Sequence, residues 1–212
     1  MGIAVYDYRN PDHVRNLFVT AEMRSRILRL ECGMEFHARH SHDLGHEIFL
    51  ILQGVAEFEI NGEIARVEPG QLCFAAVDEP HSVRVIGDEP VIMYLSVTPH
   101  ILPTHTMLDV NGERMPPHFA EPNSYDVELD ASLSRSQRIE RQRQSVRKLA
   151  AHASDLDKTH NRILDELESS DIDVEETRVR LWDDVYRVYK DMAELGDSWN
   201  DLASDLGQKD EQ

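Results

Sequence analysis

The stretch that decides the fold reads His40-Ser-His42-Asp-Leu-Gly-His-Glu47-Ile-Phe-Leu-Ile-Leu-Gln-Gly54. In an extended chain, alternate side chains point to the same face, which places Phe36, His40 and His42 together. Two histidines that are two positions apart on a strand can both reach one metal ion. A carboxylate that arrives on the next strand, from Glu47, would add an oxygen ligand. The pattern therefore predicts a metal site on a scaffold of β-strands.

The fourth ligand has to come from another part of the chain. His81 is the candidate, because it follows Pro80 and opens a predicted strand. Two further histidines lie close to the first ligand run. Because side chains alternate along an extended chain, His37 should point to the face opposite His40 and His42. His46 should lie in the loop before Glu47. Both remain alternatives, either as ligands or as hydrogen-bond partners of a ligand.

The surrounding sequence, up to about residue 130, reads as short strands separated by turns. Asn61-Gly62 is the strongest hairpin signal, because both residues accept the positive φ angles that a tight hairpin needs. Many short strands at close spacing are typical of a sandwich or a barrel. The predicted strands cover residues 25–32, 47–52, 55–60, 64–67, 72–76, 81–86 and 91–97.

Two spacings in this region resemble those of the cupins. The first cupin motif has His-x-His and a glutamate with three or four residues between them, and then a glycine after six intervening residues. His40, His42, Glu47 and Gly54 stand in that frame, with the opening glycine, Gly33, one residue out of place. In the second motif Gly70 and His81 match, whereas Ala76, Asp78 and Val85 replace the family's Pro, Gly and Asn, which shape turns.

The resemblance implies a mainly β fold, a cupin-like double-stranded β-helix (jelly-roll barrel) over residues of about 20 to 100. It also implies that His40, His42, Glu47 and His81 bind one divalent first-row metal ion, which would be Fe, Mn, Ni, Co, Cu or Zn. Four protein ligands leave two positions of an octahedral ion open for a small-molecule substrate or for dioxygen.

The resemblance to the cupins also implies an activity for this protein. The ligand set is similar to that of dioxygenase and oxidase cupins, so we expect a dioxygenase-type oxidoreductase that acts on a small oxygen-rich organic molecule. Cupin isomerases and lyases share the set. The alternative from another class is a small-molecule-binding or sensory module without turnover, whose helical tail contacts a partner.

Residues 131–212 differ in kind, because they contain no proline and space their apolar residues by three and four. This spacing predicts an α-helical hairpin that turns near residues 169–174, appended to a barrel domain of residues 1–130. Its apolar stripes have to be covered by each other, by the barrel or by another subunit, so we expect a homo-oligomer, most simply a homodimer. The stripes are Val146, Leu149, Ala153, Leu156, His160, Ile163 and Leu167, and Leu181, Val185, Val188, Met192, Leu195, Trp199, Leu202 and Leu206.

A long connection rich in proline and histidine follows the last predicted strand, from residue 98 to about 123. Long loops close to a barrel mouth are often lids or subunit arms. We expect this one to be a strap over the exterior of the barrel, with a lid as the alternative.

The composition excludes several classes of partner. Of 212 residues, 22 are Lys or Arg and 40 are Asp or Glu, which gives a net charge of −18. So acidic a chain repels phosphate backbones and anionic lipids, so we expect neither nucleic acid nor a membrane as partner. The first ten residues have no signal-peptide pattern, and two cysteines are too few for a disulfide framework. We therefore expect a cytoplasmic protein.

Overall fold

The computed structural model describes residues 2–36, 39–168 and 173–207. They form two compact units: the first contains the described residues up to Leu129 together with Gly207, and the second is Asp130–Leu206. The first unit contains ten strands and two short 3-10 helices, Pro11–His13 and Pro122–Tyr125. The strands are β1 (Asn16–Val19), β2 (Arg24–Leu30), β3 (His40–Ser41), β4 (His46–Gln53), β5 (Val55–Ile60), β6 (Glu63–Val67), β7 (Leu72–Ala75), β8 (His81–Ile86), β9 (Val91–Thr98) and β10 (Thr106–Met107).

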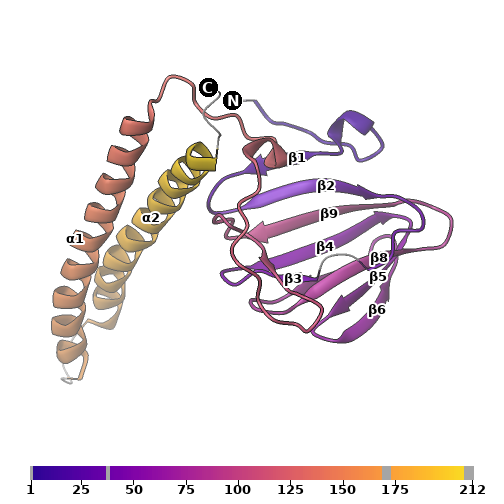
Figure 1. The fold of residues 1–212 in the computed structure, drawn as a ribbon. Coiled ribbons are helices and arrows are strands. Elements are labelled where there is room, and N and C mark those ends of the chain that lie inside the picture. The colour runs from indigo at the N-terminus through magenta and orange to yellow at the C-terminus, as the bar shows by residue number, and fades with distance from the viewer. Residues whose placement is uncertain (1, 37–38, 169–172, 208–212) are drawn as a thin grey trace. The chain divides into compact units, whose positions relative to one another are not determined.

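The strands form two five-stranded antiparallel sheets, in the orders β1-β2-β9-β4-β7 and β10-β3-β8-β5-β6. Figure 1 shows the two sheets facing each other, so that their inner faces enclose the core. The rings of Phe49 on β4 and Phe58 on β5 lie 4.8 Å apart between their centroids, one from each sheet. The predicted jelly-roll fold and the helical hairpin after it are confirmed.

Side chains along β4 are alternately buried and exposed, so one face of this strand carries both core residues and a site residue. Glu47, Phe49 and Ile51 are buried, whereas His46 and Ile48 are exposed. The strand pairs with β9 on one side and with β7 on the other, which fixes the register of its inward side chains. Glu47 is therefore held on the same face as the aromatic core.

Turn chemistry closes the strands where the sequence indicated. Asn61 and Gly62 have φ angles of 50° and 85°, and Ile60 pairs with Glu63 across the tight hairpin between β5 and β6. Gly54, with φ of 73°, ends β4, and a Cβ atom there would lie 2.5 Å from the carbonyl oxygen of Pro90. Only glycine fits this position without strain.

Every predicted strand is present, with ends displaced by at most two residues. The two-residue strands β3 and β10 and the strand β1 were not predicted. β3 and β10 pair with each other and β3 also pairs with β8, so these short segments are strands because of their neighbours. Local sequence pattern carries little of that information.

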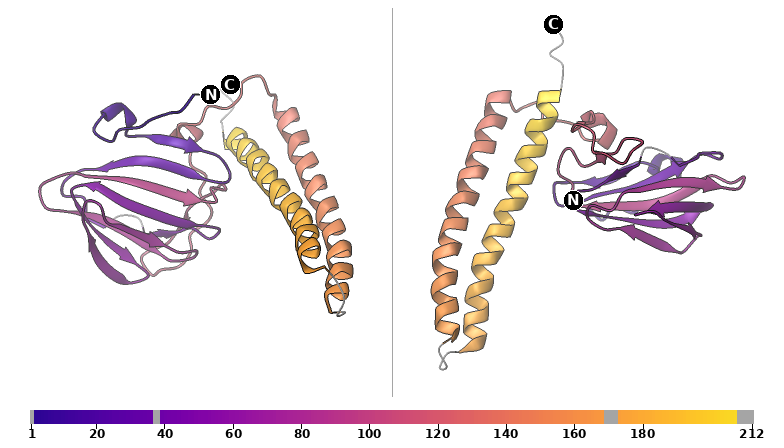
Figure 2. Two further views of the ribbon diagram at one scale, coloured as in Figure 1. Left: turned by 180° about the vertical axis from the view of Figure 1, so that it is seen from behind. Right: turned by 60° about the horizontal axis from the view of Figure 1, so that its bottom comes forward.

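The second unit is a pair of long helices, α1 (Arg135–Glu168) and α2 (Val174–Gly207), which run side by side in both views of Figure 2. A capping box starts α1, because Gln137 N donates to Ser134 Oγ while Ser134 N donates to Gln137 Oε1. Asp173 caps α2 by accepting from the backbone of Glu175 and Glu176. The predicted turn at residues 169–174 lies mostly outside the described residues.

The contact between the helices is more polar than the apolar stripes predict. Thr159 Oγ1 donates to Asp184 Oδ2 at 2.6 Å, and the His152 imidazole contacts the buried Asp191 carboxylate. Arg138 is buried and pairs with Asp201 at 3.1 Å. Of the predicted stripe residues, Ile163 and Leu202 are buried, whereas Val146, Met192 and Leu206 are about half exposed. Within the described residues, neither helix is long and apolar enough to cross a membrane.

Candidate metal centre

The four predicted ligands come from both sheets. His40 lies on β3 and pairs with His81 on β8, while His42 directly follows β3. Glu47 reaches the same point from β4 of the opposite sheet. One ligand atom from each residue lies within 4.8 Å of all the others. The structure thus brings together all four residues that the sequence singled out.

Distances within the cluster centre on one carboxylate oxygen. Glu47 Oε2 lies 3.0 Å from His42 Nε2, 2.9 Å from His81 Nε2 and 4.0 Å from His40 Nε2. His42, Glu47 and His81 are only 2 to 4% exposed, whereas His40 is half-buried at the edge of the cluster. His40 is therefore the most exposed of the four side chains.

Backbone carbonyls orient two of the imidazoles. His42 Nδ1 lies 2.6 Å from the carbonyl oxygen of Thr104, and His81 Nδ1 lies 2.9 Å from that of Glu79. A carbonyl oxygen only accepts, so both Nδ1 atoms carry protons, which directs both Nε2 atoms inward. Nε2 can face a carboxylate at 3 Å only if a proton or a cation lies between them. This is the arrangement expected of metal-binding histidines.

The spacing of the donor atoms fits a first-row metal ion. With bonds of about 2.1 Å, neighbouring ligand atoms of an octahedral ion lie about 3.0 Å apart and opposite ones about 4.2 Å apart. The three contacts to Glu47 Oε2, of 2.9, 3.0 and 4.0 Å, match these separations. Three nitrogens and one oxygen suit Fe, Mn, Ni, Co, Cu or Zn, and the donor set does not favour one of them.

The charge state of Glu47 suits a cation. Burial alone would raise the pKa of this carboxyl group, but hydrogen bonds with His42 and His81 outweigh burial and hold the pKa below its ordinary value. Glu47 is therefore ionised at neutral pH, and it supplies the one negative charge among the four side chains.

Sequence reasoning missed the contribution of the strap, the segment 98–123. Thr104 supplies the carbonyl that orients His42, and the His105 ring lies 4.9 Å from the rings of both His40 and His42. Pairing of β10 with β3 places the strap there. Burial, followed by the charges of His40 and His42, lowers the pKa of His105 to about 2. The strap thus does more than cover the exterior of the barrel, and its histidine content was the one signal for this role.

The two alternative histidines have different outcomes. His46 is exposed on the outer face of β4, and its Nδ1 accepts a hydrogen bond from the backbone of Val77 at 3.2 Å. It points away from the cluster. His37 lies outside the described residues, so its role stays a prediction.

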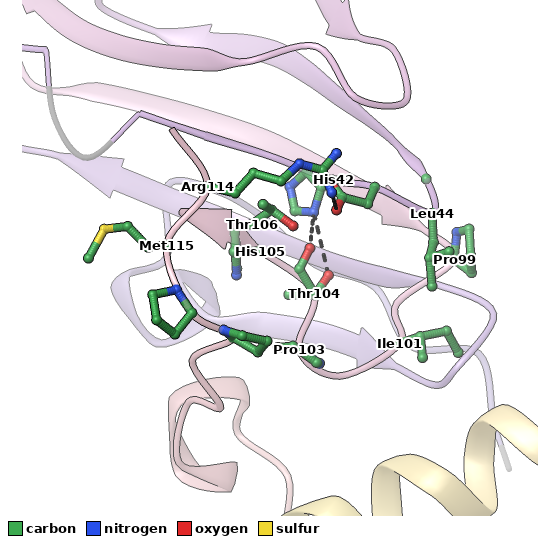
Figure 3. Close-up of a pocket in the computed structure, with 14 residues that line it drawn as sticks. His42, Leu44, Pro99, Ile101, Pro103, Thr104, His105, Thr106, Arg114 and Met115 are labelled. Atoms are coloured by element: carbon green, nitrogen blue, oxygen red, sulfur yellow. Dashed lines mark hydrogen bonds and ion pairs between the residues drawn. The ribbon is translucent and has the colours of Figure 1, made fainter. Parts of the chain in front are cut away.

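Two cavities adjoin the cluster. One, of about 450 Å³, lies under the strap and is lined by His42, Thr104, His105 and Arg114 (Figure 3). The other, of about 370 Å³, lies between the sheets and is lined by His40, Glu47, His81 and His105. Both volumes are in the range of small-molecule sites. A metal ion at the cluster would therefore be open to a ligand.

Comparisons with known proteins give one matching family model and several solved structures. Residues 27–98 match the family model described as the cupin domain. A Klebsiella pneumoniae protein with a double-stranded β-helix domain aligns over 51% of this chain and 99% of its own, with 18% identity and a TM-score of 0.45. KdgF from Halomonas sp. aligns over 41% of this chain and 76% of its own, with 20% identity and a TM-score of 0.37. Salicylate 1,2-dioxygenase from Pseudoaminobacter salicylatoxidans aligns over 37% of this chain and 20% of its own, with 18% identity and a TM-score of 0.33. No curated protein matches the sequence.

All four candidate ligands, His40, His42, Glu47 and His81, lie inside the matched segment, and the helical hairpin lies outside it. Residues 27–98, with their two facing sheets, are a cupin domain.

Proposed function

We propose that this protein is a metal-dependent enzyme in which His40, His42, Glu47 and His81 hold one divalent first-row ion. The observation that carries the proposal is the convergence of three imidazoles and one ionised carboxylate beside a small-molecule cavity. Burying such a group is costly without a cation to stabilise it. We assign the protein to the oxidoreductases of the dioxygenase type, acting on a small oxygen-rich organic molecule.

The residues of the chain would have distinct tasks in such a reaction. Thr104 and Glu79 hold two imidazoles through their backbone carbonyls, so that the Nε2 atoms stay fixed. Glu47 reduces the net charge of the centre. A bound divalent ion supplies a Lewis acid for a substrate oxygen and, if it is redox-active, a site for dioxygen. The side chains between the sheets exclude water from the substrate.

The test is metal analysis combined with oxygen uptake. The purified protein should carry about one first-row metal ion per chain, and His42→Ala should lose it. His46→Ala is the matched control, because His46 lies on the same segment but faces solvent. Oxygen consumption with a panel of enediols, flavonols and sugar acids should also disappear in His42→Ala and persist in His46→Ala.

Other outcomes would change the assignment. A wild-type protein that contains no transition metal and ignores chelators would overturn the metal centre. A metal-loaded protein that binds panel compounds without turnover would point to the sensory module instead. Product formation without oxygen uptake would favour an isomerase or a lyase.

Two further properties belong to the same proposal. We propose a homodimer that buries part of the exposed apolar surface of α1 and α2. We place the protein in the cytoplasm, since its two cysteines, Cys32 and Cys73, are both free thiols.

A further inference from the structure

Two arginines from one strand line the cavity between the sheets. Arg24 and Arg26 on β2 border it together with His40, Glu47 and His81 of the metal cluster. Arg24 is only 4% exposed, although arginine is rarely buried without a partner. The cavity thus has a cluster of metal-ligating groups and two guanidinium groups on its walls.

Neither guanidinium group has its hydrogen bonds satisfied. Arg24 Nε donates to Asn16 Oδ1 at 3.0 Å, and its guanidinium lies 5.1 Å from the centre of the Tyr125 ring. Its Nη1 is buried without a partner, and so is Nε of Arg26. Among the described residues, no carboxylate forms an ion pair with either arginine. A buried donor without a partner destabilises the folded chain, and it does so more strongly when it is charged.

The nearest acidic groups are already engaged. Glu47 Oε2 contacts the Nε2 atoms of two histidines, and Asp126 accepts hydrogen bonds from the backbone and side chain of Asn16. Burial lowers the pKa of both guanidinium groups, which reflects the cost of keeping them charged there. Against two arginines, Glu47 supplies one negative charge, and a divalent ion would add two positive ones. The cavity therefore has an excess of positive charge that an anion would balance.

The rest of the wall is apolar. Leu28, Phe49, Phe58, Met93, Leu95 and Met107 are among the side chains that enclose the cavity. Such walls favour a ligand with an apolar body, because burying apolar surface is the main gain on binding.

We propose that this cavity binds a small organic acid, with its carboxylate on Arg24 and Arg26 and its apolar body between the sheets. The planar fork of a guanidinium group matches a carboxylate, and charge-assisted hydrogen bonds of this kind are the strong ones. A phosphate offers the same oxyanion chemistry, so the test separates the two. The assignment of this acid as substrate rests on the proposed metal enzyme, whereas the binding itself does not.

The test is calorimetric titration of the full-length protein with three probes that share a phenyl ring: benzoate, benzamide and phenyl phosphate. Benzoate should bind the wild type, and its neutral isostere benzamide should bind at least about tenfold more weakly. Arg26→Gln should weaken benzoate binding by at least about tenfold. Arg29→Gln is the matched control, because Arg29 lies on the same strand but is 43% exposed and paired with Glu31.

Arg24→Gln should weaken benzoate binding as well, but it also removes the contacts with Asn16 and Tyr125, so Arg26→Gln decides the matter. The proposal is overturned if benzamide matches benzoate, if Arg26→Gln behaves like Arg29→Gln, or if the wild type does not bind benzoate. Tighter binding of phenyl phosphate than of benzoate would assign the site to phosphates and overturn the carboxylate.

Metal content, measured on the same samples, separates this inference from the proposed function. A protein without metal that binds benzoate through Arg26 would overturn the metal enzyme and support the anion site. A protein with about one metal ion per chain that binds no benzoate would overturn the anion site alone.

Discussion

Substituting Gly45 by alanine should damage the metal centre without touching a ligand. Gly45 lies between His42 and Glu47 and packs against the end of β9. A Cβ atom at this position would lie 2.4 Å from the carbonyl oxygen of Thr98. Ordinary contact begins at 3.4 Å, so the two segments have to separate by 3.4 − 2.4 = 1.0 Å. All three of the nearest atoms belong to the backbone, so no side chain can rotate away.

A displacement of this size is large for a metal site, where ligand distances have to agree within about 0.2 Å. We expect Gly45→Ala to retain metal about 10- to 100-fold more weakly, by analogy with the loss of groups that orient ligands. Overpacking should also lower the free energy of unfolding by about 1–3 kcal/mol. Elemental analysis after dialysis against increasing concentrations of a chelator measures the loss of metal affinity. Urea denaturation measures the change in the free energy of unfolding.

Gly207→Ala is the control, because a Cβ atom there meets no atom within 4 Å. The reasoning is refuted if Gly45→Ala keeps both the metal content and the unfolding free energy of the wild type.

Three further predictions concern charge, pH and assembly. Glu47→Gln keeps the volume of the side chain but removes the negative charge, so metal retention should fall by at least about tenfold while the circular dichroism spectrum stays that of the wild type; unchanged metal content would mean that Glu47 is no ligand. Burial, then the charges of Arg24 and His42, lowers the pKa of His100 from 6.5 to about 4. The unfolded chain therefore takes up this proton more readily, and the free energy of unfolding is greatest above pH 6.5 and falls by about 1.4 kcal/mol for each pH unit down to about 4. In His100→Phe this part of the slope should be absent from urea denaturation curves at pH 7, 6 and 5, and equal slopes would contradict it. Light scattering should give twice the 24.4 kDa of one chain, and a mass of one chain at micromolar concentration would contradict the homodimer.

Much of the fold could be predicted because it is encoded locally. The strand at residues 47–52 and the hairpin at Asn61-Gly62 are each encoded by a few neighbouring residues. Both are present as predicted. β3 and β10 could not be predicted, because strands of two residues exist only through their partners. The polar contact between the helices was missed for a similar reason. The spacing of apolar residues shows which face of a helix packs against its neighbour, but it does not show that Thr159 and Asp184 meet on that face.

The candidate ligands were predictable because spacing and strand parity place their side chains. His40 and His42 share a face, and Glu47 and His81 stand where the cupin motifs have ligands. His105 was not predictable as part of the site, because it reaches the cluster only through the pairing of the strap. Arg26 belongs to the predicted strand 25–32 and Arg24 directly precedes it, but the sequence does not show that their guanidinium groups border an interior cavity.

The hydrogen bond between His42 Nδ1 and the Thr104 carbonyl joins two residues that are 62 positions apart in the chain. It makes the docking of the strap and the affinity of the cluster thermodynamically linked. A cation that binds more tightly when His42 is held in place must stabilise the docked strap by the same free energy. Binding of a cation at the cluster would therefore change how firmly the strap is held at the surface of the protein.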